Sequence, residues 1–442
     1  SGSSLIVSGV GTKLVVDGNT AQQSGGGVLA ASAATVTLSS GAHMDVINNK
    51  ALTGQGGGFY LQNEGTRLDV HGEGTQLNVF GNQAKINGGG LALRSGPVVR
   101  ITASSMFQGN TASEGHGGGV AYDDDDGKED GGSSCVRLSL FVQIDGTLNV
   151  DESGNEISGD TGEALQISTL PNSPLSSINE RSAVANKKTT WCVPCGKYEL
   201  VAGTGSKVAG IKDMYLPDQS YVRLSVQRGT DASEVQNVSS RDLVLVYTTK
   251  VQTESQTSTS FRIPCAEQAV TLTHARFEAN HAALDGGAIA TPDNYKNVFF
   301  DLNNVSFISN VAVHGKGGAI RASGIQTAVQ VSGSTFRGNK ASSGGAVSID
   351  SSAGLQMFNT TAFDNIATGD YGGFLYAHSA SPILLGSVNI EGSSTSSDGG
   401  GGGLAVFGSK ILVDTTILRH CHAGKAGGGA ILLDEGATAN LL

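Results

Sequence analysis

Short stretches in which apolar and polar side chains alternate recur along most of the chain. They are three to six residues long and rich in Val, Leu, Ile and Thr, as at Leu14–Val16, Ala34–Leu38 and Val329–Val331. Alternation of period two over this length is typical of a half-buried β-strand. No stretch of 12 or more residues carries a helical stripe. The pattern therefore predicts an all-β chain built from many short strands.

A doubled glycine follows these stretches and returns after about 26 to 32 residues, except across one long gap. The copies lie at Ser24–Val28, Gly56–Tyr60, Gly88–Ala92, Gly117–Ala121, Gly286–Ala290, Gly317–Arg321, Gly344–Ser348, Gly372–Tyr376, Gly401–Val406 and Gly427–Leu432. A fixed period of this size indicates stacked repeats that share one continuous core.

A second signal precedes most of the glycine pairs: an apolar residue followed three positions later by Asn. The pairs are Val16/Asn19, Val46/Asn49, Val79/Asn82, Phe107/Asn110, Phe277/Asn280, Phe307/Asn310 and Phe336/Asn339. Glycine permits tight corners, and buried Asn side chains can bond backbone groups at a bend and one another from repeat to repeat. We expect a parallel β-helix of roughly ten rungs about 4.8 Å apart, with an inward-facing Phe stack. The structural repeat positions that we expect are Asn110, Gly118, Asn280, Gly287, Asn310, Gly318, Asn339 and Gly345.

Four GGA[IV] copies, at Gly286–Ile289, Gly317–Ile320, Gly344–Val347 and Gly428–Ile431, alternate with FxxN spellings. This combination resembles the polymorphic outer membrane protein repeat of chlamydial autotransporter adhesins, which also occurs in large surface proteins of algae and protists. The resemblance covers about three quarters of the chain. It implies a right-handed β-helix with an extracellular adhesive or structural role, and it brings no active site with it.

The glycine pairs are missing between Gly119 and Gly286. Arg137–Ile144 and Thr161–Ile167 still have the pattern of a rung, whereas Pro171, Pro174 and a polar stretch follow. We therefore expect three parts: β-helix repeats over 1–170, an inserted cysteine-containing β-rich module over 171–265, and β-helix repeats again over 266–442.

Cysteines gather around this expected insertion, which contains the spelling Cys192-Val-Pro-Cys195-Gly-Lys-Tyr198. The spelling resembles the start of cysteine-rich, ephrin-receptor-like modules. A zinc site would require a second ligand pair, and a thioredoxin-like redox site would require a βαβ context. We expect disulfides among Cys135, Cys192, Cys195 and Cys265, with their pairing left open. Cys421 remains as a buried small hydrophobe.

Composition and charge restrict the compartment and the partners. Gly makes up 64 of 442 residues, charged residues 15%, and the net charge is −11 without a basic stripe, so a nucleic-acid partner is not expected. No apolar run reaches the length of a membrane span. Ser1 and Leu442 both fall within rungs, so we expect a segment of a longer exported precursor. Sequons at Asn237, Asn304 and Asn359 are candidates for N-glycosylation.

Three groups of residues could carry chemistry. Gly115-His116-Gly117 matches a spelling found around an active-site histidine of polygalacturonase-like enzymes, but its RxK partner is missing, and we interpret His116 as a turn residue. Asp123–Asp126, with Glu129 and Asp130, is either a solvated loop or a Ca²⁺ site. His420 and His422 flank Cys421 without a fourth metal ligand. We therefore expect no catalytic residues, no metal and no cofactor.

Two functional hypotheses follow from the sequence. The first is a non-enzymatic extracellular rod, a glycosylated segment of a larger surface or filament protein that mediates assembly or attachment. Its partners would be other copies or flanking domains of the same protein, and also surface proteins or glycans. The alternative is a carbohydrate-binding or polysaccharide-cleaving β-helix. It would require convergent carboxylates and aromatic platforms, and Trp191 and the nine tyrosines are not clustered in the sequence.

Overall fold

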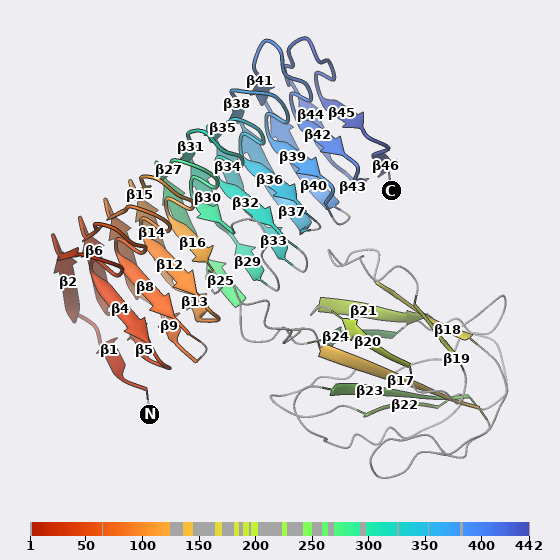
Figure 1. Ribbon diagram of the computed structural model, residues 1–442, viewed down its shortest axis with the longest axis horizontal. Helices are drawn as coiled ribbons and strands as arrows, with labels where there is room; N and C mark the ends of the chain where they lie inside the picture. The colour runs from red at the N-terminus through yellow and green to blue at the C-terminus, as the bar shows by residue number, and fades with distance from the viewer. Residues whose placement is uncertain are drawn as a thin grey trace. The chain divides into compact units, whose positions relative to one another are not determined.

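The computed structural model describes residues 2–123 without 64, residues 269–441 without 292–297, 325–326, 352 and 381–382, and eight strands between residues 136 and 263. Side chains are described outside 123–269. The chain forms two compact units, residues 1–129 with 267–442 and residues 130–266. The first unit is a parallel β-solenoid of about ten rungs, whose strands run in chain order from red to blue in Figure 1.

Each rung contributes strands to three parallel sheets, named A, B and C here. Sheet A has 19 strands in two runs, which merge where β37 and β40 are long enough to belong to both. Its first run contains β1 (Ser4–Ser8), β5 (Thr35–Ser39), β9 (Arg67–Val70), β13 (Val98–Ile101), β25 (Ala269–Thr273), β29 (Phe299–Asn303), β33 (Ala328–Ser332), β37 (Gly354–Phe363), β40 (Ile383–Glu391), β43 (Lys410–Asp414) and β46 (Thr438–Leu441). Its second run adds β2 (Lys13–Asp17), β6 (His43–Ile47), β10 (Gln76–Phe80), β14 (Ser104–Gln108), β26 (Ala275–Glu278), β30 (Ser306–Ile308), β34 (Thr335–Arg337) and β44 (Ile417–Arg419).

Sheets B and C complete each rung. Sheet B contains two-residue strands: β3 (Thr20–Ala21), β7 (Lys50–Ala51), β11 (Gln83–Ala84), β15 (Thr111–Ala112), β27 (His281–Ala282), β31 (Val311–Ala312), β35 (Lys340–Ala341), β38 (Ile366–Ala367) and β41 (Ser394–Thr395). Sheet C contains β4 (Val28–Ala31), β8 (Phe59–Gln62), β12 (Leu91–Arg94), β16 (Val120–Asp123), β28 (Ile289–Ala290), β32 (Ile320–Ser323), β36 (Val347–Asp350), β39 (Leu375–His378), β42 (Leu404–Phe407) and β45 (Ile431–Asp434).

The asparagine corner forms a continuous ladder through the core. Asn280 is fully buried, and both its backbone N–H (3.1 Å) and its Nδ2 (2.9 Å) donate to Oδ1 of Asn310. Its Nδ2 also donates to the carbonyl of Phe107 at 2.9 Å, so the amide group is satisfied without water. The same arrangement links Asn19, Asn49, Asn82, Asn110, Asn280, Asn310, Asn339 and Asn365.

The apolar residue of the repeat forms a second stack beside this ladder. Phe107, Phe277, Phe307 and Phe336 stack with centroid separations of 4.7–5.3 Å and interplanar angles of 10–13°. The next rung has Ala362 in this register, and Phe374 meets Phe336 edge-on at 5.7 Å. A large side chain from the glycine corner thus fills the space left by a small one, which keeps the core close-packed.

The stacking continues across the long gap between the glycine pairs. β14 pairs with β26, β15 with β27 and β16 with β28, and Asn110 bonds to Asn280, 170 positions later. The chain therefore leaves the solenoid after β16 and rejoins it at β25 in unbroken register.

The second unit contains two four-stranded sheets. One has the order β20 (Thr189–Val193), β17 (Val136–Ile144), β23 (Asp242–Thr249), β22 (Arg223–Gln227), and the other β19 (Arg181–Val184), β18 (Ala164–Thr169), β21 (Gly196–Val201), β24 (Thr259–Ile263). The strand expected at Arg137–Ile144 is present, but it pairs with β20 and β23 instead of with solenoid strands. Likewise β18, which covers most of the second expected rung strand, pairs with β19 and β21.

Candidate functional site

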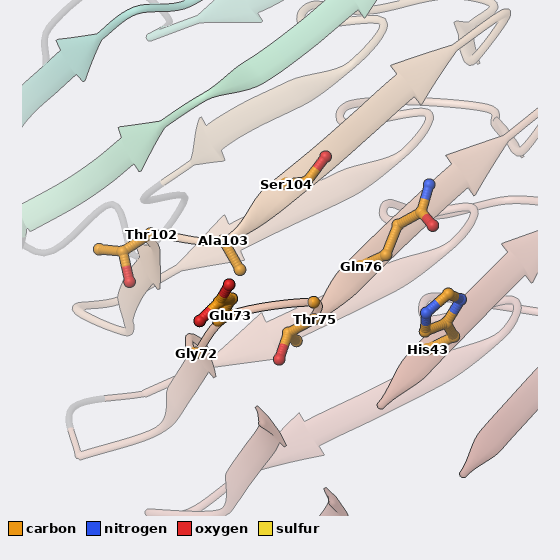
Figure 2. A pocket seen from close by; sticks show the side chains of 9 residues that line it. His43, Gly72, Glu73, Thr75, Gln76, Thr102, Ala103 and Ser104 are labelled. Carbon is orange, nitrogen blue, oxygen red and sulfur yellow. The ribbon is translucent and has the colours of Figure 1, made fainter. Parts of the chain in front are cut away.

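An open hollow lies on the outside of sheet A, where the two strand runs meet (Figure 2). It has a volume of about 640 Å³ and is lined by His43, Gly72, Glu73, Gly74, Thr75, Gln76, Thr102, Ala103 and Ser104. His43, Gln76 and Ser104 are register neighbours on β6, β10 and β14, while Glu73 lies in the turn before β10. The lining is polar and apolar in equal parts, and it offers a carboxylate, an amide, an imidazole and hydroxyls.

A second polar ladder involves residues that precede glycine pairs. At several rungs the side chain at this position accepts the backbone N–H of the equivalent residue one rung further on. Ser24 Oγ accepts from Gln55 (3.1 Å), Asn87 Oδ1 from His116 (2.9 Å), and Asp285 Oδ1 from Lys316 (2.7 Å). The sequence pattern does not reveal this ladder because its members differ in type, although all of them precede the first glycine of a pair.

His116 and Asp285 are consecutive members of this column. His116 Nδ1 lies 3.3 Å from the backbone nitrogen of Asp285 and 3.2 Å from its Oδ2. Unprotonated Nδ1 accepts the N–H, and protonated Nδ1 donates to the carboxylate. His116 is thus a corner residue, as the sequence predicted, and its hydrogen-bond partner, Asp285, lies on the next rung.

The pKa of Asp285 is held below its usual value by this surrounding. Burial alone would raise the pKa, but the hydrogen bond from His116, the Arg321 charge and the Lys316 N–H outweigh it. The carboxylate is therefore kept ionised, and it binds one backbone N–H and one side chain.

Charged side chains continue along the same side of the solenoid over sheet C. Arg321 and Asp350, with 4% and 8% of their side chains exposed, form an ion pair at 2.7 Å, and Lys316 Nζ lies 3.8 Å from the same carboxylate oxygen. Lys316 Nζ also lies 5.0 Å from the ring centroid of Tyr376.

Aromatic rings gather in the following rungs. Tyr371 and Tyr376 approach Phe407 at 4.9 and 5.7 Å, and His378 lies 6.4 Å from it. His378 also faces Glu435 at 3.3 Å. The tyrosines look unclustered in the sequence, yet register places Tyr376 and His378 one rung before Ala405 and Phe407. The spacing of each residue from its glycine pair is the signal that could have revealed this cluster.

The other sequence-predicted residues have varied positions. Asn304 and Asn359 are exposed at corners between the two runs of sheet A, with φ of 53° and 47°. Cys421 was expected to be buried, but it is a partly exposed free thiol; burial of the rest of the side chain raises its pKa. Asn237, Cys135, Cys195, Cys265, Asp124–Asp126, Glu129 and Asp130 lie outside the described residues, and Cys192, Trp191 and Asp123 are described by backbone alone.

Among the residues that the structure describes, no group of three or more His, Cys, Asp or Glu side chains has metal-binding geometry. Nor do these residues contain a helix that is long and apolar enough to cross a membrane.

A scan of protein-family models, a search of curated proteins and a search of solved structures found no match to this chain.

Proposed function

We propose that the chain is a segment of an extracellular structural or adhesive rod, without catalytic activity, that mediates assembly or attachment in a larger surface or filament protein. The observation that carries the proposal is the asparagine ladder. Its buried amides are satisfied by neighbouring rungs, so the core's polar groups serve stacking. A solenoid stabilised in this way presents long, regular outer faces to partners.

Several finer features belong to the same proposal. The rod is right-handed and carries repeats of the polymorphic outer membrane protein type, supported by the GGA[IV] and FxxN spellings. A disulfide-stapled insertion interrupts the rod, and the second compact unit, residues 130–266, supports this. The protein is secreted and glycosylated at its sequons, and exposure of Asn304 and Asn359 supports this. Its partners are other copies or flanking domains of the same protein, surface proteins or glycans.

Sedimentation velocity with negative-stain microscopy tests the proposal. We expect concentration-dependent association of the purified chain into rods, and no new reducing ends when it is incubated with neutral and acidic polysaccharides. Cleavage of a polysaccharide that disappears in Glu73→Gln or His116→Ala would refute the structural role.

Carbohydrate binding is a second candidate, favoured by the hollow in Figure 2. Its carboxylate, amide and hydroxyl groups suit the hydroxyls of a sugar, and few polar groups suffice to orient a ligand. Titration calorimetry with a panel of oligosaccharides should then give binding that weakens at least fivefold in Gln76→Ala. The exposed Gln83 on β11 of sheet B supplies the control, since Gln83→Ala should leave binding unchanged.

A further inference from the structure

The cluster of Tyr371, Tyr376, His378 and Phe407 forms an aromatic patch on the outside of sheet C. Phe407 is 7% exposed and lies at its base, and the other three rings are half-buried. Tyr376 lies 6.5 Å from both Tyr371 and His378, with interplanar angles of 20° and 3°. Half-exposed tyrosines that share a buried phenylalanine offer a rigid contact surface of the kind enriched at protein interfaces.

Negative charge surrounds this aromatic patch. Asp350 is the register neighbour of His378, and Glu435 contacts His378 from the far side. Burial raises the pKa of Tyr376, and the charges of Asp350, Glu435 and Asp370 raise it further against the opposing charge of Arg321. The surroundings of the ring therefore favour a positive charge.

A cation already lies on the patch. The ammonium of Lys316 lies 5.0 Å from the Tyr376 centroid and 3.8 Å from Asp350 Oδ2 on a side chain that is 38% exposed. The other oxygen of this carboxylate, Asp350 Oδ1, is buried and has no hydrogen-bond partner among the described residues. A carboxylate oxygen in such a position is costly unless a donor reaches it.

We propose that the aromatic patch is the docking site for an arginine side chain of a partner protein, which displaces Lys316 from Tyr376 and donates to Asp350. The guanidinium fits better than an ammonium, because it stacks on a ring and presents several donors in one plane. The net charge of −11 also favours a basic partner. This inference rests on the proposed attachment function and names the chemistry of its partner.

NMR titration of the full chain with N-acetyl-arginine amide tests the proposal. Signals of Tyr376 and His378 should shift in a saturable way, and Tyr376→Leu should weaken binding at least fivefold while Tyr376→Phe preserves it. Lys316→Met should tighten binding at least threefold, because the competing ammonium is gone. Lys13→Met is the matched control: it removes the same charge from a lysine paired with Asp45 at 2.7 Å on sheet A.

Three results would overturn the inference: equal effects of Lys316→Met and Lys13→Met, binding that survives Tyr376→Leu in the folded protein, or cellohexaose shifting these signals where the arginine probe does not. The proposed attachment function can fail independently of the docking site. If the arginine probe binds as expected but the chain neither associates nor attaches, the attachment role is wrong and the cation site stands. If the Tyr376→Leu variant associates and attaches like the parent chain, the aromatic patch does not contribute to attachment. The assignment of a partner to it is then wrong.

Discussion

The two glycines of each pair satisfy different constraints. Gly317 has φ of +67°, a conformation that other residues adopt at a cost. Gly318 has no such φ, but a Cβ there would lie 2.5 Å from the backbone nitrogen of Lys340 and closer still to the carbonyl of Gly345. The first glycine makes the corner, and the second lets adjacent rungs approach.

Gly318→Ala should therefore be far more damaging than an alanine at an open corner. The added methyl group meets two backbone segments of the next rung, which cannot move without separating the rungs. We expect a loss of more than about 3 kcal/mol in the free energy of unfolding. Urea denaturation measures it. Gly109→Ala is the comparison, because Gly109 has φ of +62° but no atom within 4 Å of a Cβ, so its cost should stay near 1 kcal/mol. Equal losses would contradict this account.

Asn310→Ala should break the asparagine ladder. It removes the acceptor of the Asn280 backbone N–H and side-chain amide, and the donor to Phe277, all in the dry core. We expect a loss of about 3–5 kcal/mol in urea denaturation. Asn303→Ala, which removes an outward-facing amide bonded to Asp301, should cost under about 1 kcal/mol. A ladder variant as stable as the Asn303 variant would contradict the role of the ladder.

Asp285 makes stability depend on pH in a defined direction. Its pKa is lower in the folded chain than the unfolded value of about 3.9. Its contribution is therefore complete above pH 4 and is lost as the pH falls through the folded pKa. Urea denaturation at pH 5, 4 and 3 should show that the free energy of unfolding decreases less with falling pH in Asp285→Asn than in the parent chain. Asp398→Asn, at an exposed pair with Lys425, should follow the parent chain.

Residues of constant type were predictable, and residues of variable type were not. Asn280, Asn310 and Gly318 recur unchanged, so their period reveals both position and role. His116 and Asp285 occupy one column but share only the ability of their side chains to accept a hydrogen bond. Their pairing depends on register between segments 169 positions apart, which the sequence gap conceals.

At the scale of elements, the side chain that a strand can hold at each core position depends on the side chains at the same register position in the neighbouring rungs. The Phe stack ends at Phe336 because β37 has Ala362 there, and Phe374 fills the space from a column that holds Ala288, Ala319 and Ala346 in earlier rungs. The core thus preserves volume by exchanging large and small side chains between two columns.

This exchange predicts a rescue. Phe374→Ala should create a cavity and cost about 3–5 kcal/mol. Adding Ala362→Phe should recover at least half of that loss, because the rung then has the Phe and Ala pattern of its neighbours. Thermal or urea denaturation of the two single variants and the double variant gives the coupling free energy between the two positions. A double variant no more stable than Phe374→Ala would show that the columns do not exchange volume.

Strand existence was easier to predict than strand partnership. Alternation correctly indicated a strand at Arg137–Ile144, but alternation states only that one face is buried. Its partners, β20 and β23, are set by contacts distant in the sequence. For the solenoid strands the pairing partner was predictable as well, because the repeat period indicates which segment lies one rung away.

At the scale of the whole molecule, the solenoid does not need a short connection between its fourth and fifth rungs. Replacing residues 130–266 by a flexible linker of one rung's length should leave both ladders intact. Closing a shorter loop should add about 1–2 kcal/mol to the stability of the solenoid. Circular dichroism and denaturation test this. Aggregation or loss of the parallel β signal would show that the solenoid depends on those residues.

The ladders also determine how the solenoid would respond to force. Hydrogen bonds between rungs run along its axis, whereas the covalent chain winds around it. Tension along the axis therefore loads three sheets and two side-chain columns together, and failure passes from rung to rung because each rung contacts only its neighbours. Successive asparagines are mostly 26 to 33 residues apart, so each step would release roughly 90–120 Å of chain. Repetition thus predicts that, in a pulling experiment, the solenoid extends in repeated steps of similar length.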